Sequence, residues 1–329
     1  MESDIEKLNK IFYCDYHKRM EELKKSTNKL VHYTSASAGL KILQNKEIWM
    51  RRVSCMNDFS EVQHGKDLFI DLWKNTERDI IQKLTSLFGD NGDVFNEVMG
   101  ELGKISAFNI LHSYITCFSE HLESEDKYGR LSMWRGYGKG TGIALVLKKD
   151  IFYSDYDSLD VFTSPVAYLN QEEIKDKFIS LATDLEENKQ KIDFKNIQRD
   201  DLRDFLIEWL EILILSIKHP AFCEEKEWRV ISFEGAKGIK KDIIDLNGMP
   251  QPIQKIPLSE KLQTDGDGFS VNEILDHIII GPTQYAIPIY QALVEELEKL
   301  NVKDAKKKVV FSDIPYLSLI HISEPTRPY

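Results

Sequence analysis

The order of strand-like and helix-like segments is the feature that most restricts the fold of this chain. Short segments rich in β-branched and aromatic residues are separated by long helical stretches, and no βαβ unit repeats. Such an irregular order is typical of α+β proteins and not of doubly wound sheets. We therefore predict an α+β fold with a small, mixed or antiparallel central sheet and long helical insertions. The expected strands are 30–34, 48–53, 113–119, 142–147, 161–169, 225–233, 276–280 and 308–312.

The chain divides into three parts. In residues 1–26, the stretch Asp4–Lys25 has apolar residues at helical spacing and is expected to form an amphipathic helix on the outside of the protein. Residues 27–316 are expected to form one domain with helical inserts at 60–105 and 171–219. Within 317–329, the stretch LSLIHISEPTR resembles the translation of a common sequencing-library adapter. We expect an artefact tail there and exclude it from fold prediction.

Composition restricts the class of partner. With 42% hydrophobic and 29% charged residues, the chain is an ordinary globular sequence. Its net charge of −11 argues against sequence-independent binding to duplex DNA or to an anionic membrane. The first residues lack an apolar signal core, and the longest apolar run, Ile212–Ile217, is far too short to span a bilayer. The four cysteines form no CxxC pair or zinc-type cluster, so we expect reduced thiols in a cytoplasmic protein.

Two motifs carry side chains suited to holding a nucleotide. His32-Tyr33-Thr34 ends a predicted strand, where the imidazole can hydrogen-bond a ribose hydroxyl and Thr34 can fix the loop or add a donor. Trp134 and Tyr137 are three residues apart and share one face of a helical turn, which can stack on a flat heterocycle such as nicotinamide. Taken singly, a structural histidine and ordinary core aromatics are the simpler explanations.

A third motif places charges on a predicted strand. Glu225, Glu227 and Arg229 are spaced by two residues and point to the same side of an extended chain. A solvated edge strand is the simple explanation, whereas a cleft in which one carboxylate polarises a substrate hydroxyl is the functional one. The sequence has no Walker A, GxGxxG, HExxH or GxSxG motif, so none of those chemistries is indicated.

Six motifs stand out in combination: HYT at 32–34, MNDFSE at 56–61, CFSE at 117–120, MWRGYG at 133–138, KHPAFCEEKEWR at 218–229 and IIIGPT at 278–283. Together they resemble a bacterial family, domain-of-unknown-function family 2971, over roughly residues 32–316. The resemblance implies a relation to the ADP-ribosyltransferase superfamily, a sheet of that type, and NAD as substrate.

The resemblance also implies roles for single residues. His32 holds the ribose, Tyr137 stacks on nicotinamide and Glu227 is the catalytic glutamate. Glu225 completes a Glu-x-Glu pair that helps to position the acceptor. Further NAD contacts are expected from Tyr33, Thr34 and Trp134. The family pattern includes, without an assigned role, Asn57, Asp58, Glu61, Ser119 and Arg229. The arginine and the Ser-Thr-Ser strand of arginine-directed transferases have no clear counterpart, so the acceptor, nucleic acid or protein, stays open.

Three functions remain open from the sequence. The first is an NAD-dependent ADP-ribosyltransferase that needs no metal and, by family analogy, acts in phage defence or as a toxin-type effector. The second is a sensor that binds NAD or another nucleotide without transferring anything. The third is a hydrolase, either an NAD glycohydrolase or a metal-dependent nuclease-like effector. The nuclease would use the carboxylates of Asp58, Glu61, Glu225 and Glu227. The first function requires His32, Tyr137 and Glu227 to line one cleft.

Overall fold

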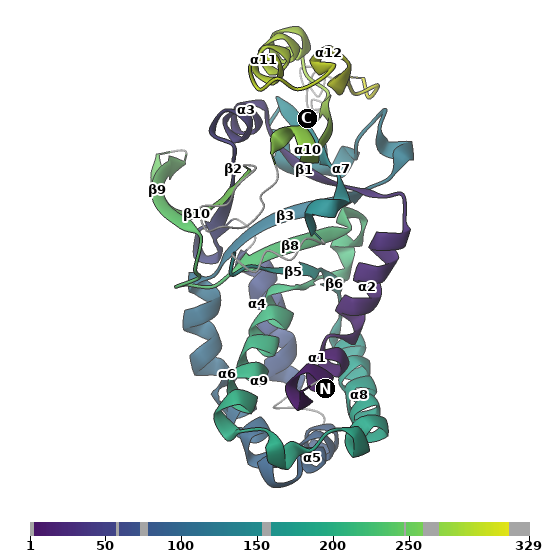
Figure 1. Cartoon of the computed structure of the whole chain (residues 1–329), viewed down its shortest axis with the longest axis vertical. Helices are drawn as coiled ribbons and strands as arrows, with labels where there is room; N and C mark the ends of the chain where they lie inside the picture. Colours follow the sequence, from purple (N-terminus) through teal and green to yellow (C-terminus); the bar gives the residue numbers. More distant parts are fainter. Residues whose placement is uncertain are drawn as a thin grey trace, which may run out of the picture.

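A computed structural model describes the backbone of residues 3–56, 59–72, 78–152, 159–246, 248–258 and 270–315. The α+β prediction is confirmed for these residues: a mixed, open sheet is combined with many helices. Figure 1 shows an elongated molecule with the sheet across its middle. A large helical lobe lies on one side of the sheet. Towards the other end lie α3 (Ala36–Asn45), α10 (Val271–Ile274), α11 (Ala286–Lys299) and α12 (Ala305–Lys308). The predicted tail at 317–329 lies outside the described residues.

The main sheet has ten strands among the described residues, so it is larger than predicted. Its order is β12-β11-β4-β1-β3-β2-β10-β9, and β8 pairs with β3 and with β5. All its ladders are antiparallel except β11 with β12. The strands are β1 (Lys29–Ser35), β2 (Glu47–Arg52), β3 (Tyr114–His121), β4 (Gly142–Leu147), β5 (Phe162–Pro165), β8 (Glu227–Ser232), β9 (Lys240–Leu246), β10 (Met249–Pro257), β11 (Leu275–Ile280) and β12 (Val309–Phe311). A separate parallel pair joins β6 (Ala167–Tyr168) to β7 (Ile217–Lys218).

The sheet forks at β3. On one edge, the end of β3 pairs with β1, whereas its start pairs with β2. On the opposite edge, β8 pairs with β3 continuously from Tyr114 to Ser119. Cys117 belongs to neither the β1 nor the β2 ladder, so its carbonyl needs another partner. The ring of His32 supplies it, because Nδ1 donates to the Cys117 carbonyl at 2.9 Å.

The two predicted helical inserts pack together into one lobe with α1. Helices α6 and α4 both pack on α9, and α5 and α1 both pack on α8. The lobe has its own apolar core, in which Phe12 meets Trp209 edge-on with ring centroids 4.8 Å apart. Asn170 starts α8 with a capping box, as its sequence position before Glu173 allows. The lobe helices are α1 (Asp4–Phe12), α4 (Phe59–Asp71), α5 (Arg78–Leu87), α6 (Gly92–His112), α8 (Gln171–Asn188) and α9 (Arg199–Leu215).

The N-terminal segment differs from the single outer helix that the sequence suggested. It forms α1 and α2 (Cys14–Lys25), which meet at Tyr13, where the backbone leaves the helical region with φ −105° and ψ 25°. Leu8 is fully buried in the lobe core, whereas Leu23 is buried in the core below α3 and α11. The kink lets two apolar stripes face two different cores, so the segment joins both parts of the molecule.

The remaining helices cover the two faces of the sheet. Residues of α3 (Ala36–Asn45), α10 (Val271–Ile274) and α11 (Ala286–Lys299) share one apolar core with Leu30, Leu145 and Ile278. On the opposite face, α7 (Leu131–Tyr137) packs on Val31 and Val146. We call the side of the sheet on which α7 packs the α7 face. The short helix α12 (Ala305–Lys308) precedes β12.

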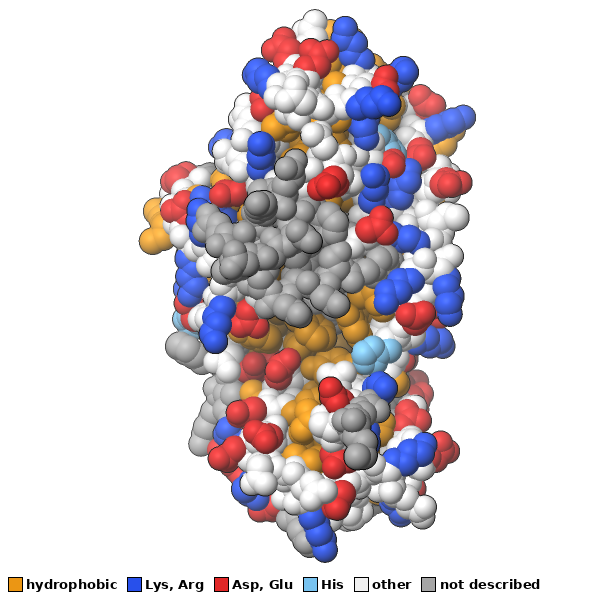
Figure 2. Space-filling model, in the orientation of Figure 1, with side chains coloured by type: hydrophobic (Ala, Val, Ile, Leu, Met, Phe, Trp, Pro, Cys, Tyr) orange, Lys and Arg blue, Asp and Glu red, His pale blue; other side chains and the backbone are white. Residues whose placement is uncertain are grey.

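The surface agrees with the acidic composition. In the view of Figure 2, acidic and basic side chains are interspersed over the coloured residues, without a broad basic field. Among the described residues, none of the helices combines the length and the apolar character needed to cross a membrane.

Candidate functional site

The ladder pairs determine which predicted site residues share a face of the sheet. Residues opposite each other in an antiparallel ladder point to the same side. Val31, Ser119 and Glu227 form one row across β1, β3 and β8 on the α7 face. Tyr33, two residues after Val31, shares this face, and His32 lies on the opposite one. The structure therefore does not bring His32 and Glu227 into one cleft.

His32 has a structural setting. Its ring lies 5.5 Å from that of Phe118 and closes the fork through the bond to the Cys117 carbonyl. Burial lowers the pKa of His32 below its usual value, which favours the neutral ring. The cavity beside it is apolar and measures ≈ 10 Å³, room for about one water and far too small for a dinucleotide. Thr34 lies on the same face as His32, near Gly39 of α3.

The predicted stacking platform is part of a packed core. Trp134 is buried, donates from Nε1 to the Tyr128 carbonyl at 2.8 Å and meets the Tyr33 ring edge-on at 4.8 Å. Glycines enclose the indole: a Cβ added at Gly281 would lie 2.7 Å from its Cε3, and one at Gly129 2.4 Å from its Cζ2. The half-buried Tyr137 packs against the same core. The indole of Trp134 is therefore enclosed and does not offer a face to a ligand.

Four charged side chains meet on the α7 face between the lobe core and the core under α7. The Lys218 ammonium lies 2.7 Å from Glu225 Oε2 and 3.1 Å from Glu227 Oε2. Arg229 Nε donates to Glu227 Oε1 at 2.7 Å, and Arg229 Nη1 donates to the Leu215 carbonyl at 2.7 Å. We call Lys218, Glu225, Glu227 and Arg229 the charge cluster. The Glu-x-Glu pair of the sequence is thus held together by one lysine.

Local structure places each member of the charge cluster. Lys226 adopts a left-handed conformation with φ 45°, which ends the turn Pro220–Glu225 and starts β8 at Glu227. The β6–β7 pair brings Lys218 next to Tyr168, whose hydroxyl accepts from the Glu227 amide at 2.8 Å. These contacts fix the Glu227 carboxylate from its backbone outwards.

Electrostatics keep Glu227 ionised. Burial by itself raises the pKa of the Glu227 carboxyl, but the charges of Arg229 and Lys218 outweigh it and hold the pKa at about 2. Burial together with the nearby Glu227 charge raises the pKa of the Cys117 thiol well above its ordinary value, so that thiol stays protonated. The site therefore holds a permanent anion next to a neutral thiol.

The charge cluster lies directly under a surface turn. The Lys218 ammonium lies 4.9 Å from the centroid of the Phe222 ring, and that ring is 41% exposed. Residues 221–224 are all exposed, whereas Glu227 is 4% exposed. Glu225 ends this turn, so the turn carries one carboxylate of the charge cluster, and the buried Glu227 follows it in the chain.

Arg130 connects the charge cluster to the rest of the α7 face. Its Nη1 donates to the Glu225 carbonyl at 2.8 Å, and its amide donates to the Tyr33 hydroxyl at 2.9 Å. The same guanidinium binds the Glu125 carboxylate at 2.8 Å. The turn before β8 and the aromatic pair Tyr33–Trp134 are thus tied to one side chain.

Of the other residues in the family pattern, some are placed by the structure and others lie outside its described part. Ser119 is buried and lies opposite Glu227 in the ladder. Asn57 and Asp58 lie outside the described residues, and Glu61 is in α4 with a side chain that is not described. The four-carboxylate nuclease centre therefore stays a prediction.

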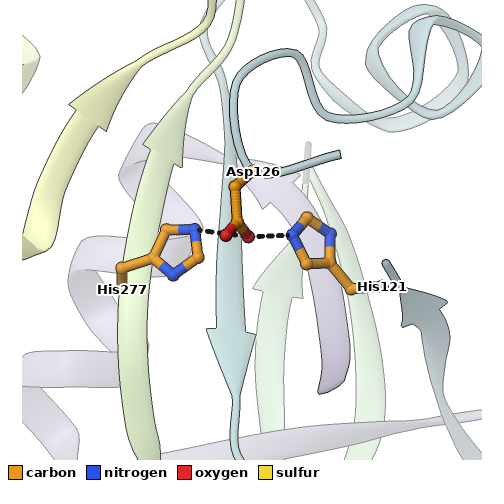
Figure 3. Close-up of side chains that lie close together, drawn as sticks. All are labelled: His121, Asp126 and His277. Carbon is orange, nitrogen blue, oxygen red and sulfur yellow. Dashed lines mark hydrogen bonds and ion pairs between the residues drawn. The ribbon is translucent and has the colours of Figure 1, made fainter. Parts of the chain in front are cut away.

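Sequence reasoning missed several polar residues. Lys218 opens the motif KHPAFCEEKEWR, and a lysine seven residues before one glutamate and nine before another is a weak signal without the fold. Reasoning from the sequence also missed a second cluster, which is formed by His121, Asp126 and His277 and is shown in Figure 3. His121 directly follows the CFSE motif, but His277 comes from a distant strand, so spacing could not reveal the group.

The comparisons with known proteins give one match. Residues 133–230 match the sequence model of a family described as a protein of unknown function, DUF2971. The matched stretch contains the whole charge cluster, Trp134 and Tyr137, and it supports the family predicted from the motifs over a shorter range than 32–316. Neither the curated proteins nor the solved structures give a significant match.

Proposed function

We propose that the chain is an NAD-consuming enzyme of the ADP-ribosyltransferase type in which Glu227 is the catalytic carboxylate. The observation that carries the proposal is the Glu225–Lys218–Glu227 arrangement at the start of β8, in which Lys218 and Glu227 are buried and Glu225 is partly buried. Burying charged groups is costly, and such perturbed groups are concentrated at functional sites. The cluster also lies within the stretch that matches the family.

The chemistry fits a permanent anion. Cleavage of the nicotinamide–ribose bond develops positive charge on the ribose, and an oriented carboxylate stabilises that charge. A carboxyl with a pKa of about 2 is ionised throughout the physiological range. Glu225, held on the same lysine, is suited to orient the acceptor. Ser119, opposite Glu227 in the ladder, adds a hydroxyl to this face.

The geometry changes the roles given to other residues. His32 is not part of the proposed site, because it faces the opposite side of the sheet. Trp134 supports the site through Tyr33 and Arg130 and does not stack on nicotinamide. NAD would approach from the exposed turn Pro220–Glu225, which must move because Glu227 is 4% exposed. The acceptor, protein or nucleic acid, stays open in the proposal.

Nicotinamide release from NAD by the purified chain tests the proposal. Glu227→Gln should lower turnover by at least ~100-fold, as loss of a transition-state electrostatic contact does. Because the glutamine leaves Lys218 and Arg229 under-compensated, folding of each variant is checked by circular dichroism and rates are compared below the unfolding transition. Glu227→Asp keeps the charge and should retain part of the activity. His32→Ala is the control and should leave turnover by the folded protein unchanged.

Two further measurements bear on Glu227 and on the acceptor. Equal turnover by wild type and Glu227→Gln would remove this carboxylate from the mechanism. Incubation with labelled NAD and cell extract, followed by nuclease or protease, then identifies the acceptor from the treatment that releases the label.

A second candidate function is NAD binding without transfer. One observation favours it: Arg229 engages Glu227 Oε1 and Lys218 engages Oε2, so both carboxylate oxygens already have cationic partners. Calorimetric titration with NAD separates the two functions. Saturable binding together with undetectable nicotinamide release would support the sensor.

A further inference from the structure

Three polar side chains from separate segments converge at one end of the α7 face, apart from the charge cluster. His121 ends β3, Asp126 follows the short turn Glu123–Glu125, and His277 lies in β11. Asp126 Oδ1 lies 2.8 Å from His121 Nε2 and 3.5 Å from His277 Nε2. Figure 3 shows the carboxylate between the two rings, and one ligand atom from each residue lies within 4.8 Å of the others.

The tautomer of His277 leaves a lone pair directed at this point. His277 Nδ1 lies 2.7 Å from Asp276 Oδ2, and a carboxylate can only accept, so Nδ1 carries a proton. Asp276 is in turn fixed by the Lys29 ammonium at 2.7 Å. In the neutral ring, Nε2 is then unprotonated. It is buried and has no hydrogen-bond partner among the described residues. Two electron-rich atoms that face each other at 3.5 Å call for a cation between them.

His121 completes the set from the other side. Its side chain is fully buried, and its ring centroid lies 5.9 Å from that of His277. Nδ1 has no hydrogen-bond partner in the described part of the chain, and its nearest acid is Glu125, 3.9 Å away. Nε2 lies 2.8 Å from Asp126 Oδ1 and, because a carboxylate can only accept, it donates its proton there; a cation bound at this point would replace that proton.

The loop that carries Asp126 is held in place. Arg130 binds Glu125 at 2.8 Å, and the Asp313 amide donates to the Lys127 carbonyl at 2.8 Å. The Tyr128 carbonyl accepts from Trp134 Nε1 at 2.8 Å and from Ser312 Oγ at 2.7 Å. A ligand loop fixed on both sides of the carboxylate loses little entropy when it binds an ion.

We infer that His121, Asp126 and His277 form a binding site for one divalent transition-metal ion of the Zn²⁺ class. Two imidazole nitrogens and one carboxylate oxygen suit borderline metals better than Mg²⁺ or Ca²⁺, which prefer oxygen ligands. Bonds of about 2.0–2.1 Å in a tetrahedron place ligand atoms about 3.3 Å apart, and the 2.8 and 3.5 Å separations bracket that spacing. The Asp276–His277 pair is the outer carboxylate that commonly orients a metal-binding imidazole.

Three protein ligands leave a coordination position for water or another ligand. The Asp126 side chain is 39% exposed, so solvent reaches the site from that side. The site uses none of the residues of the charge cluster, and it stands or falls independently of NAD chemistry.

Metal binding by the full-length chain tests the inference. The protein is stripped with a chelator, and Zn²⁺ is then added and counted by elemental analysis after dialysis. We use a Cys14→Ser/Cys223→Ser background, because both thiols are exposed and could bind zinc adventitiously. One zinc per chain is expected, together with a higher melting temperature. Co²⁺ should give the visible absorption of a low-coordinate nitrogen–oxygen site, whereas Mg²⁺ should not raise the melting temperature.

Variants assign the ligands. Asp126→Asn and His277→Ala should each lose the bound zinc, whereas Asp276→Asn should weaken affinity by about 10–100-fold, as outer-shell carboxylates do. His17→Ala, an exposed histidine on α2, is the matched control and should keep full stoichiometry.

Failure of the wild type to retain zinc would overturn the inference. So would unchanged zinc content in both ligand variants. If His277→Ala lowers the melting temperature equally with and without zinc, the cluster is instead an imidazolium held between Asp126 and Asp276.

Discussion

Glu227 shows how a buried anion is tolerated at the scale of single residues. Two positive side chains, Lys218 and Arg229, balance two negative ones, Glu225 and Glu227, within direct contact distance. Removing one partner of such a group typically costs about 3–5 kcal/mol, because it leaves an uncompensated buried charge. The four residues therefore behave as one unit, and no member can be changed without affecting the others.

This unit predicts a pH dependence of stability. The pKa of Glu227 is about 2 in the folded chain, below its ordinary value of 4.5. The ionised Glu227 therefore contributes on the order of 3 kcal/mol to the free energy of unfolding. This contribution is complete above pH ~4.5 and is lost as the pH falls towards 2. Urea unfolding at pH 3 to 7 measures the free energy of unfolding of wild type and of Glu227→Gln. The difference between the two should be largest above pH 5 and should narrow below pH 4.5. The exposed Glu187→Gln should show no such trend.

His32 shows where prediction from sequence stops at this scale. The pattern correctly gave a strand at Leu30–Thr34, and alternation implies that neighbours face opposite sides. It could not say which side carries the site, because that depends on the partners β3 and β4. The ladder places Tyr33, not His32, on the side of Glu227. For the site proposed at Glu227, residue type alone therefore favoured the neighbour that faces the opposite side of the sheet.

At the scale of elements, local patterns gave most of the sheet. The strands expected near 48–53, 142–147 and 276–280 match β2, β4 and β11 within one residue at each end. The hairpin of β9 and β10 was missed, although Asn-Gly at 247–248 is a typical hairpin signal, because Pro250 and Pro252 argue against a strand. Both prolines pair with β9, whereas the β2 ladder covers β10 only from Ile253 to Pro257, so the prolines lie outside the part of β10 that is paired on both edges.

The close packing around Trp134 of α7 yields a prediction about two glycines, one beside this indole and one in open space. Gly281 follows β11, and a methyl group there would lie 2.7 Å from Trp134 Cε3. Gly281→Ala should destabilise the protein by about 1–3 kcal/mol through overpacking and shift the tryptophan emission. In α6, Gly100 is exposed with open space around it, so Gly100→Ala should stabilise by about 0.5–1 kcal/mol. Urea unfolding compares the two; equal effects would mean that Trp134 can move aside.

At the scale of the whole molecule, the charge cluster exists because distant segments meet. Lys218 comes from the end of one helical insert, Glu227 from the sheet, and the Leu215 carbonyl from the last turn of α9. Composition and periodicity predicted both inserts, but nothing local showed that they would join into one lobe against the α7 face. The polar row Ser119–Glu227 lies where the lobe core and the α7 core adjoin. A boundary between two apolar cores cannot be read from either part alone.

The N-terminal segment packs into two different cores, and this arrangement leads to a prediction about how the whole molecule unfolds. Chains of more than ~250–300 residues commonly split into separate domains, yet here α1 and α2 place Leu8 in the lobe core and Leu23 in the core under α3. Ile115 and Ile231 of the sheet also belong to the lobe core. We therefore expect the lobe and the sheet to unfold as one cooperative unit.

Two core truncations test this coupling. Leu8→Ala and Leu23→Ala should each cost about 2–5 kcal/mol and move the far-ultraviolet and tryptophan-fluorescence transitions to the same lower urea concentration. Ile179→Ala, at a position on α8 that is 42% exposed, should change little. The test uses a Trp73→Phe/Trp209→Phe background, because Trp209 belongs to the lobe core. The coupling fails if Leu8→Ala separates the two transitions in that background, because the helical signal of the lobe would then be lost before the remaining tryptophans report unfolding. In that case the kink at Tyr13 would be a hinge between independent units and not a joint that makes them fold together.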